Sequence, residues 1–146
     1  MAAKLAYASI LARDIAALAE FYSLALGFPE IEGHRSPIYR CLDAGGMELG
    51  FNDWQAYRLL AIEHLAPQRE KAVSSYLTFE VGSQEELERI CALAISNGAT
   101  LHKPPYDTYY NARQCVLGDP EGNVFRLNYR KGRRLPAAQV ENPPWT

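Results

Sequence analysis

Four short segments of this 146-residue chain alternate apolar side chains with side chains that could bind or transform a small molecule. The polar positions are Tyr7 and Ser9, Glu48 and Asn52, Tyr76, Thr78 and Glu80, and Arg126 and Asn128. Successive side chains of a strand point to opposite faces, so each segment predicts a strand with one apolar and one polar face. Such faces either meet water, on a sheet backed by helices, or line a cavity if the sheet curls. In a cavity, carboxylates and phenols could act as acid or base, and a guanidinium as electrophile.

A second candidate group is aromatic. The chain has nine tyrosines, and several lie near a tryptophan or an arginine: Trp54, Tyr57, Tyr106, Tyr109 and Tyr110, with Arg113 beside the last. These rings could stack on a planar ligand. Packing in a dimer interface is an equal alternative, because Tyr, Trp and Arg are enriched there as well.

Composition excludes several classes of protein. The formal net charge of −2 argues against a dedicated nucleic-acid binder. No run of apolar residues approaches the roughly 18 needed to span a bilayer, and the N-terminus lacks a signal-peptide pattern, so we expect a cytoplasmic protein. The three cysteines, Cys41, Cys91 and Cys115, are an odd number and lack metal-ligand spacing. We therefore expect neither a disulfide framework nor a zinc ribbon. We expect the three thiols to be unreactive.

The elements that must position these residues repeat along the chain. A strand over 5–11 is followed by Asp14 as a helix N-cap and Gly27 as the helix end. Residues 28–53 then contain three short β-like runs, and 54–65 an apolar insertion. The order returns with a strand over 76–81, a helix after Ser83 that ends at Gly98, and strands over 99–103, 112–117 and 123–129.

This order of elements predicts an α+β fold. The single domain would span residues 1–146 and consist of two tandem βαβββ modules with eight strands in all. The modules span 4–66 and 74–131, and neither is expected to be stable alone. The apolar strand faces must be covered by the two helices. Residues 132–146 form a tail that is either solvated or packed on a second subunit.

The motifs of both modules resemble those of the vicinal oxygen chelate superfamily, which includes glyoxalase I, bleomycin-resistance proteins and extradiol dioxygenases. The matching stretches are RDIAALAEFYSLALGF, GGMELGFND, YLTFEV and YYNARQCVLGDPEGNVFRL. The last is the most specific, because the family shows an Asp-Pro-x-Gly-Asn turn before its final strand. The resemblance implies that the eight strands curl into a cup, with the ligand or metal inside and the aromatic set at its rim. It also implies a homodimer, the usual state in this family.

Enzymes of that family hold a divalent metal with four side chains, whose positions match Tyr7, Glu48, Tyr76 and Arg126 here. Only Glu48 is a usual ligand, and a guanidinium would repel a cation. The three histidines, His34, His64 and His102, do not stand at these positions. We therefore expect no metal cofactor at this site.

If Glu48 and Arg126 meet across the cup, the guanidinium would replace the charge of the missing cation. With Tyr7 and Tyr76 they would form a polar floor for an acidic or hydroxylated small molecule. The alternative is an ion pair that only serves as scaffold. The remaining candidate ligand-binding residues are Asn52, Thr78, Asn128, Trp54, Tyr109, Tyr110 and Arg113.

The leading hypothesis is a metal-free, dimeric binding protein of the bleomycin-resistance type, with a small-molecule ligand and no nucleic-acid or membrane partner. The alternatives are an enzyme of the same superfamily, such as a lactoylglutathione-lyase-like protein, an isomerase or a dioxygenase with a non-standard active site, and a structural dimer with a vestigial cup. The residues do not identify the ligand.

Overall fold

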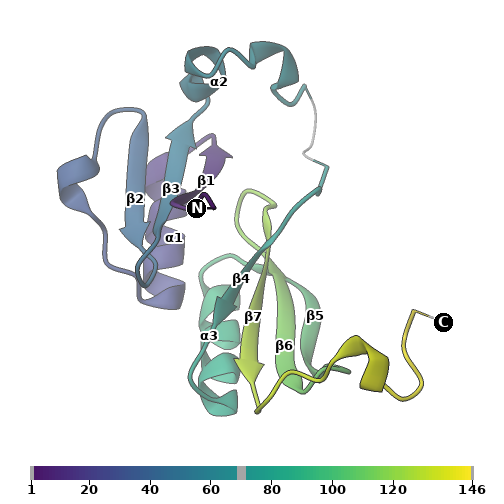
Figure 1. The fold of residues 1–146 in the computed structure, drawn as a ribbon. Coiled ribbons are helices and arrows are strands. Elements are labelled where there is room, and N and C mark those ends of the chain that lie inside the picture. Colours follow the sequence, from purple (N-terminus) through teal and green to yellow (C-terminus); the bar gives the residue numbers. More distant parts are fainter. Residues whose placement is uncertain (1, 69–71, 146) are drawn as a thin grey trace. The chain divides into compact units, whose positions relative to one another are not determined.

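A computed structural model describes residues 2–68 and 72–145. The chain divides into two compact units, Met1–Ala72 and Val73–Thr146, which are drawn with their element labels in Figure 1. Each unit places one long helix against one sheet. None of the described helices is long and apolar enough to cross a membrane.

The first unit contains a three-stranded sheet in the order β1-β3-β2. Its elements are β1 (Tyr7–Ala12), α1 (Ile15–Leu26), η1 (Glu32–His34), β2 (Tyr39–Asp43), β3 (Glu48–Asp53), α2 (Gln55–Leu59) and η2 (Glu63–Leu65). Strand β3 runs parallel to β1 and antiparallel to β2. The Asp14 side chain caps α1 by accepting a hydrogen bond from the Ala17 N–H at 2.9 Å. Gly27 ends the helix with a positive φ of 75°.

The second unit contains a four-stranded sheet in the order β4-β7-β6-β5. Its elements are β4 (Leu77–Glu80), α3 (Gln84–Ser96), β5 (Thr100–Asp107), β6 (Ala112–Gly118), β7 (Val124–Arg130) and η3 (Ala137–Gln139). Ser83 caps α3 by accepting from the Glu86 N–H at 3.0 Å, as the sequence predicts. Strands β4 and β7 are parallel, whereas β6 runs antiparallel to both of its neighbours, β7 and β5.

The predicted strand count needs one correction, because the described residues form seven strands in two sheets rather than eight in one curled sheet. The missing strand lies before β2, where Glu30 makes only an isolated bridge to Leu42. Two backbone hydrogen bonds hold this stretch to β2, at Pro29 and Ile31, and the chain then turns into η1. A short helical turn replaces the ladder, so the first unit has one strand fewer than the second.

The predicted alternation of faces is confirmed in both units. In β7, Phe125 and Leu127 are fully buried, while the intervening Arg126 and Asn128 are partly exposed. Helix α3 packs on this sheet and contacts β6 and β7, so we place the buried side chains on the helix side. In β3, Leu49 and Phe51 are buried in the same way, and Tyr22 of α1 stacks on Phe51 at 5.5 Å. Each sheet therefore keeps a polar face opposite its helix.

The C-terminal segment packs on its own unit. The Leu135 N–H donates to the Tyr110 carbonyl at 3.2 Å, and Asn111 donates to the Arg133 carbonyl at the same distance. The Trp145 ring meets Tyr109 edge to face at 5.1 Å. These contacts hold the segment against the connection between β5 and β6.

Candidate functional site

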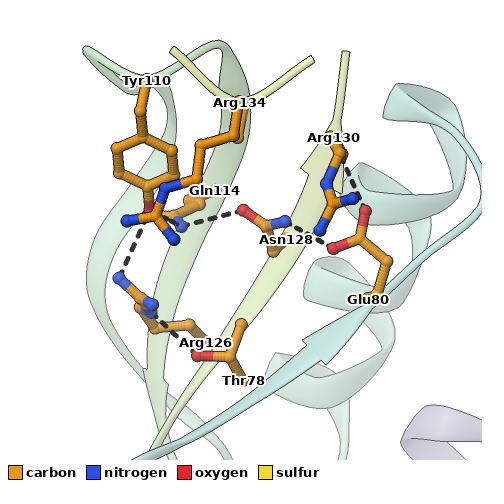
Figure 2. A pocket seen from close by; sticks show the side chains of 9 residues that line it. Thr78, Glu80, Tyr110, Gln114, Arg126, Asn128, Arg130 and Arg134 are labelled. Carbon is orange, nitrogen blue, oxygen red and sulfur yellow. Dashed lines mark hydrogen bonds between the residues drawn. The ribbon is translucent and has the colours of Figure 1, made fainter. Parts of the chain in front are cut away.

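The polar face of the four-stranded sheet contains a pocket of about 200 Å³ (Figure 2). Its lining residues come from β4, β6, β7, the connection before β6 and the C-terminal segment: Thr78, Glu80, Tyr110, Ala112, Gln114, Arg126, Asn128, Arg130 and Arg134. Strand register explains this grouping. Thr78 lies opposite Arg126, and Asn128 lies between Glu80 on one side and Gln114 on the other.

Gln114 is the centre of the hydrogen-bond network in this pocket. Only 1% of its surface is exposed. Its amide nitrogen donates to the Tyr110 hydroxyl and, at 2.8 Å, to Asn128 Oδ1. Its amide oxygen accepts from the Tyr106 hydroxyl at 2.9 Å and from Arg126 at 3.4 Å. A buried amide with these partners is fully satisfied, so it fixes the side chains around it.

Arg126 is held by neutral groups. Its Nε donates to Thr78 Oγ1 at 3.1 Å, one of its terminal nitrogens donates to Gln114, and its guanidinium lies 4.7 Å from the centre of the Tyr76 ring. None of these contacts cancels the positive charge. The guanidinium therefore presents its charge toward the pocket in a fixed orientation.

Glu80 is the one carboxylate among the lining residues. It accepts hydrogen bonds from the Asn128 amide and from the Arg130 backbone N–H, the latter at 2.7 Å. Within the described residues, Arg126, Arg130 and Arg134 make no ion pair. The Arg134 guanidinium instead lies 4.9 Å from the Tyr110 ring centre. Three guanidinium groups against one carboxylate leave the pocket positively charged.

Tyr106 supports the network from β5. Burial raises the pKa of this phenol, and the nearby Tyr110 adds to the effect, while Arg126 acts in the opposite direction. The phenol therefore stays protonated and donates to Gln114.

A second polar cluster lies in the first unit, around Glu48. One of its carboxylate oxygens is 2.9 Å from His34 Nδ1, and the other accepts from the Tyr39 hydroxyl at 3.3 Å. The buried Cys41 sulfur is 3.7 Å from the same His34 nitrogen. Burial raises the pKa of the Cys41 thiol, and burial also raises the pKa of Tyr39.

The structure brings several predicted ligand residues together. Thr78, Asn128, Tyr110 and Arg126 line one pocket, and Tyr76 contacts Arg126. In the first unit, the exposed Tyr7 lies opposite Glu48 in the β1–β3 register.

Four other predicted residues are not among the residues that line this pocket. Asn52 pairs with Tyr39 in the β2–β3 register, Trp54 lies under the Arg13 guanidinium, and Tyr109 packs on Trp145. Arg113 makes ion pairs with Glu88 of α3 and with Asp107, so it projects to the helix side of the sheet rather than into the pocket.

Three polar residues that line the pocket and one side-chain cluster were not predicted from the sequence. Gln114 alternates with buried apolar residues of β6, a pattern that could have placed it on the polar face. Arg130 and Arg134 lie at the end of β7 and in the segment interpreted as a tail. The approach of His34 to Cys41 and Glu48 depends on the turn at η1, which no sequence signal specified.

Residues 4–127 match the profile of the Glyoxalase/Bleomycin resistance protein/Dioxygenase superfamily. The chain belongs to this superfamily. No significant match is found among curated proteins.

Solved structures similar to this glyoxalase-superfamily chain include a glyoxalase/bleomycin resistance protein/dioxygenase family enzyme from Burkholderia phytofirmans PsJN, with 44% identity over 88% of this chain and 99% of that one, and a TM-score of 0.83. A glyoxalase-related enzyme from Fulvimarina pelagi has 18% identity over 92% and 93% of the two chains, with a TM-score of 0.74. A lactoylglutathione lyase from Agrobacterium tumefaciens has 14% identity over 89% and 96%, with a TM-score of 0.67. The last two comparisons concern the fold alone.

The superfamily implies a divalent metal, but the side chains at its four ligand positions do not fit one. Arg126 has no lone pair to donate and carries a fixed positive charge, while Tyr7 and Tyr76 are phenols. Glu48 alone supplies a usual donor, so three of the four positions lack one. This donor set is not one for a divalent cation.

Proposed function

We propose that this glyoxalase-superfamily chain binds a small organic acid in the pocket on the polar face of its four-stranded sheet. The observation that carries the proposal is the Arg126 guanidinium, which is oriented by Thr78 and Gln114 and has no carboxylate partner among the described residues. A carboxylate or phosphate on the ligand would complete the hydrogen bonding of this guanidinium and offset its charge.

The other lining groups support an acid that carries additional polar atoms. The amides of Gln114 and Asn128 and the hydroxyl of Tyr110 offer donors and acceptors beside Arg126. Arg134 covers Tyr110, and it would add a second positive charge at the pocket edge. A pocket of about 200 Å³ suits a small metabolite rather than a large drug-sized ligand.

Binding in this proposal needs no metal at the positions of Tyr7, Glu48, Tyr76 and Arg126, since Arg126 supplies the positive charge. A cup that spans both modules, with a floor shared by Glu48 and Arg126, stays a prediction. So do the homodimer and the cytoplasmic location expected from the superfamily resemblance and the composition.

A thermal-shift screen of small carboxylates and phosphates tests the proposal. Saturation at 100 times Kd would stabilise the folded state by about 2.7 kcal/mol. Arg126→Ala should weaken binding roughly 10- to 100-fold, because a hydrogen bond to a charged group contributes about 1.5 to 3 kcal/mol. Arg126→Lys keeps the positive charge but lacks the planar guanidinium that bonds a carboxylate in two places, so it should lose less affinity than Arg126→Ala.

Arg89→Gln is the matched control, because Arg89 is 62% exposed on α3 and its one ion pair within the described residues is with Glu86 of the same helix. This variant should bind the acid as tightly as the wild type. Equal affinity of Arg126→Ala and Arg89→Gln for every stabilising acid would contradict the proposal, as would a broad panel in which no acid raises the unfolding temperature.

An enzyme of the lactoylglutathione-lyase, isomerase or dioxygenase type is the second candidate, since a structurally similar protein is named as a lactoylglutathione lyase. In that case a Tyr or Glu48 would serve as acid or base and Arg126 as electrophile. Mass spectrometry of the bound acid after prolonged incubation separates the two functions. An unchanged ligand favours binding alone, whereas a product that disappears in Arg126→Ala favours catalysis.

A further inference from the structure

The first unit gathers three side chains whose donor atoms differ in kind but lie close together. An imidazole nitrogen of His34, the sulfur of Cys41 and a carboxylate oxygen of Glu48 all lie within 4.8 Å of one another. Within the described part of the chain, no other group of His, Cys, Asp and Glu side chains comes together in this way. The cluster shares no residue with the pocket proposed to bind an acid, whose lining residues all belong to the second unit.

Local backbone structure explains why these residues meet. Cys41 lies opposite Gly50 in the β2–β3 register, and Glu48 lies two residues before Gly50 on the same face. The turn of η1 starts directly after Ile31, whose N–H donates to the Cys41 carbonyl at 3.0 Å, and it brings His34 back over this face. The sequence therefore delivers three donors to one point from a turn and two strands.

Gly50 is required for this arrangement. A Cβ atom at position 50 would stand 2.7 Å from the Tyr39 hydroxyl, so the Tyr39 ring lies where a side chain would otherwise be. From there the Tyr39 hydroxyl donates to Glu48 Oε2, at 3.3 Å, and leaves Oε1 directed at His34. A hydrogen bond on the outer oxygen of a ligating carboxylate is a common way to orient it.

We propose that His34, Cys41 and Glu48 bind a divalent cation of the Zn²⁺ class and leave one coordination position for water or a ligand atom. Imidazole nitrogen, thiolate sulfur and carboxylate oxygen form a mixed donor set that suits Zn²⁺ and Co²⁺, whereas Mg²⁺ and Ca²⁺ prefer oxygen donors alone. Catalytic zinc sites have three protein donors and leave the fourth position open, whereas structural zinc sites use four protein donors.

Two of the three donor separations suit such an ion after a small adjustment, and the third, between Cys41 and Glu48, is at most 4.8 Å. Bond lengths of about 2.0 to 2.3 Å at tetrahedral angles place neighbouring donors roughly 3.3 to 3.8 Å apart. The Cys41 to His34 separation is 3.7 Å. The His34 to Glu48 separation of 2.9 Å is that of a hydrogen bond. On binding, the ion would replace the shared proton and move these two atoms about half an ångström apart.

Titration of the full-length chain, without an affinity tag, with Co²⁺ tests the proposal. Thiolate ligation gives an intense near-ultraviolet charge-transfer absorption that carboxylate and imidazole ligands do not produce. We expect this band to saturate at one equivalent, to disappear in Cys41→Ser, and to be displaced by Zn²⁺. Cys91→Ser is the matched control, since Cys91 is also a buried free thiol but lies in α3, and it should retain the band.

His34→Ala keeps the test meaningful if Cys41→Ser fails to fold, because the His34 side chain is 53% exposed. It should weaken Zn²⁺ binding at least about 100-fold, since even residues behind the ligands cost 10- to 100-fold when removed. His64→Gln, on η2, should bind Zn²⁺ like the wild type. A wild-type titration without the thiolate band, or Zn²⁺ affinity in His34→Ala within about threefold of that of His64→Gln, would overturn the proposal.

Discussion

Replacing Gln114 with leucine removes the amide at the centre of the pocket's hydrogen-bond network while nearly keeping the side-chain volume. Gln114 is buried and bonds to Tyr110, Asn128, Tyr106 and Arg126. We expect the folded chain to lose both stability and the fixed orientation of Arg126.

The magnitude follows from the partners. Three hydrogen bonds to neutral groups at about 1 kcal/mol each sum to roughly 3 kcal/mol. Tyr110, Asn128 and Arg126 are partly exposed and can turn to water, whereas the desolvated Tyr106 hydroxyl is left without its acceptor. Burying leucine in place of an amide returns about 1 kcal/mol. The expected loss in the free energy of unfolding is therefore about 2 kcal/mol, or roughly 4 to 8 °C in Tm.

Urea denaturation followed by circular dichroism measures this loss, with Gln84→Leu as control. Gln84 is exposed at the start of α3, so its replacement should change the free energy of unfolding by less than about 0.5 kcal/mol. The midpoint should fall in Gln114→Leu with the m-value unchanged. A change no larger than that of the control would refute the view that Gln114 organises the network.

Three further outcomes are expected. Asp14→Ala, which removes the N-cap of α1, should cost about 1 kcal/mol of unfolding free energy in chemical denaturation. Gly50→Ala should cost about 1 to 3 kcal/mol because the added Cβ would meet the Tyr39 hydroxyl at 2.7 Å, and the tyrosine fluorescence should change with it. Asp107 has a pKa held below its ordinary value, chiefly by the hydrogen bond from Lys131. Its contribution to stability is present above the unfolded-state pKa and is lost as pH falls through the lower folded-state pKa, so Lys131→Ala should flatten the acid limb of a stability–pH curve.

Local signals in the sequence predicted most of the elements. The caps of both long helices are recognisable because Asp14 and Ser83 precede apolar stripes and Gly27 ends the first helix. The polar faces of β3 and β7 were predictable because strand side chains alternate strictly. These features depend only on neighbours within a few residues.

The strand expected before β2 was not predictable in the same way. Glu30 and Ile31 have the pattern of a strand, but the chain leaves β2 after two backbone hydrogen bonds and forms η1. Whether such a segment continues as a ladder depends on its partner strand. The turn at η1 decides where the imidazole of His34 lies. Because the sequence did not predict this turn, it did not place His34 at a site.

Gln114 shows why charge alone does not locate a binding site. From the sequence we expected Arg126 to pair with the Glu48 carboxylate, because a buried carboxylate without a partner is costly. A guanidinium on a partly buried face in turn needs acceptors. The pocket meets that need with an amide and a hydroxyl. Neutral acceptors fix the orientation of the guanidinium and leave its charge uncompensated. A carboxylate would fix the same orientation but neutralise the charge. A site that attracts an acid from water needs a guanidinium whose charge is not neutralised. The cross-strand register of β4, β7 and β6 produces this arrangement by placing Thr78 and Gln114 beside Arg126.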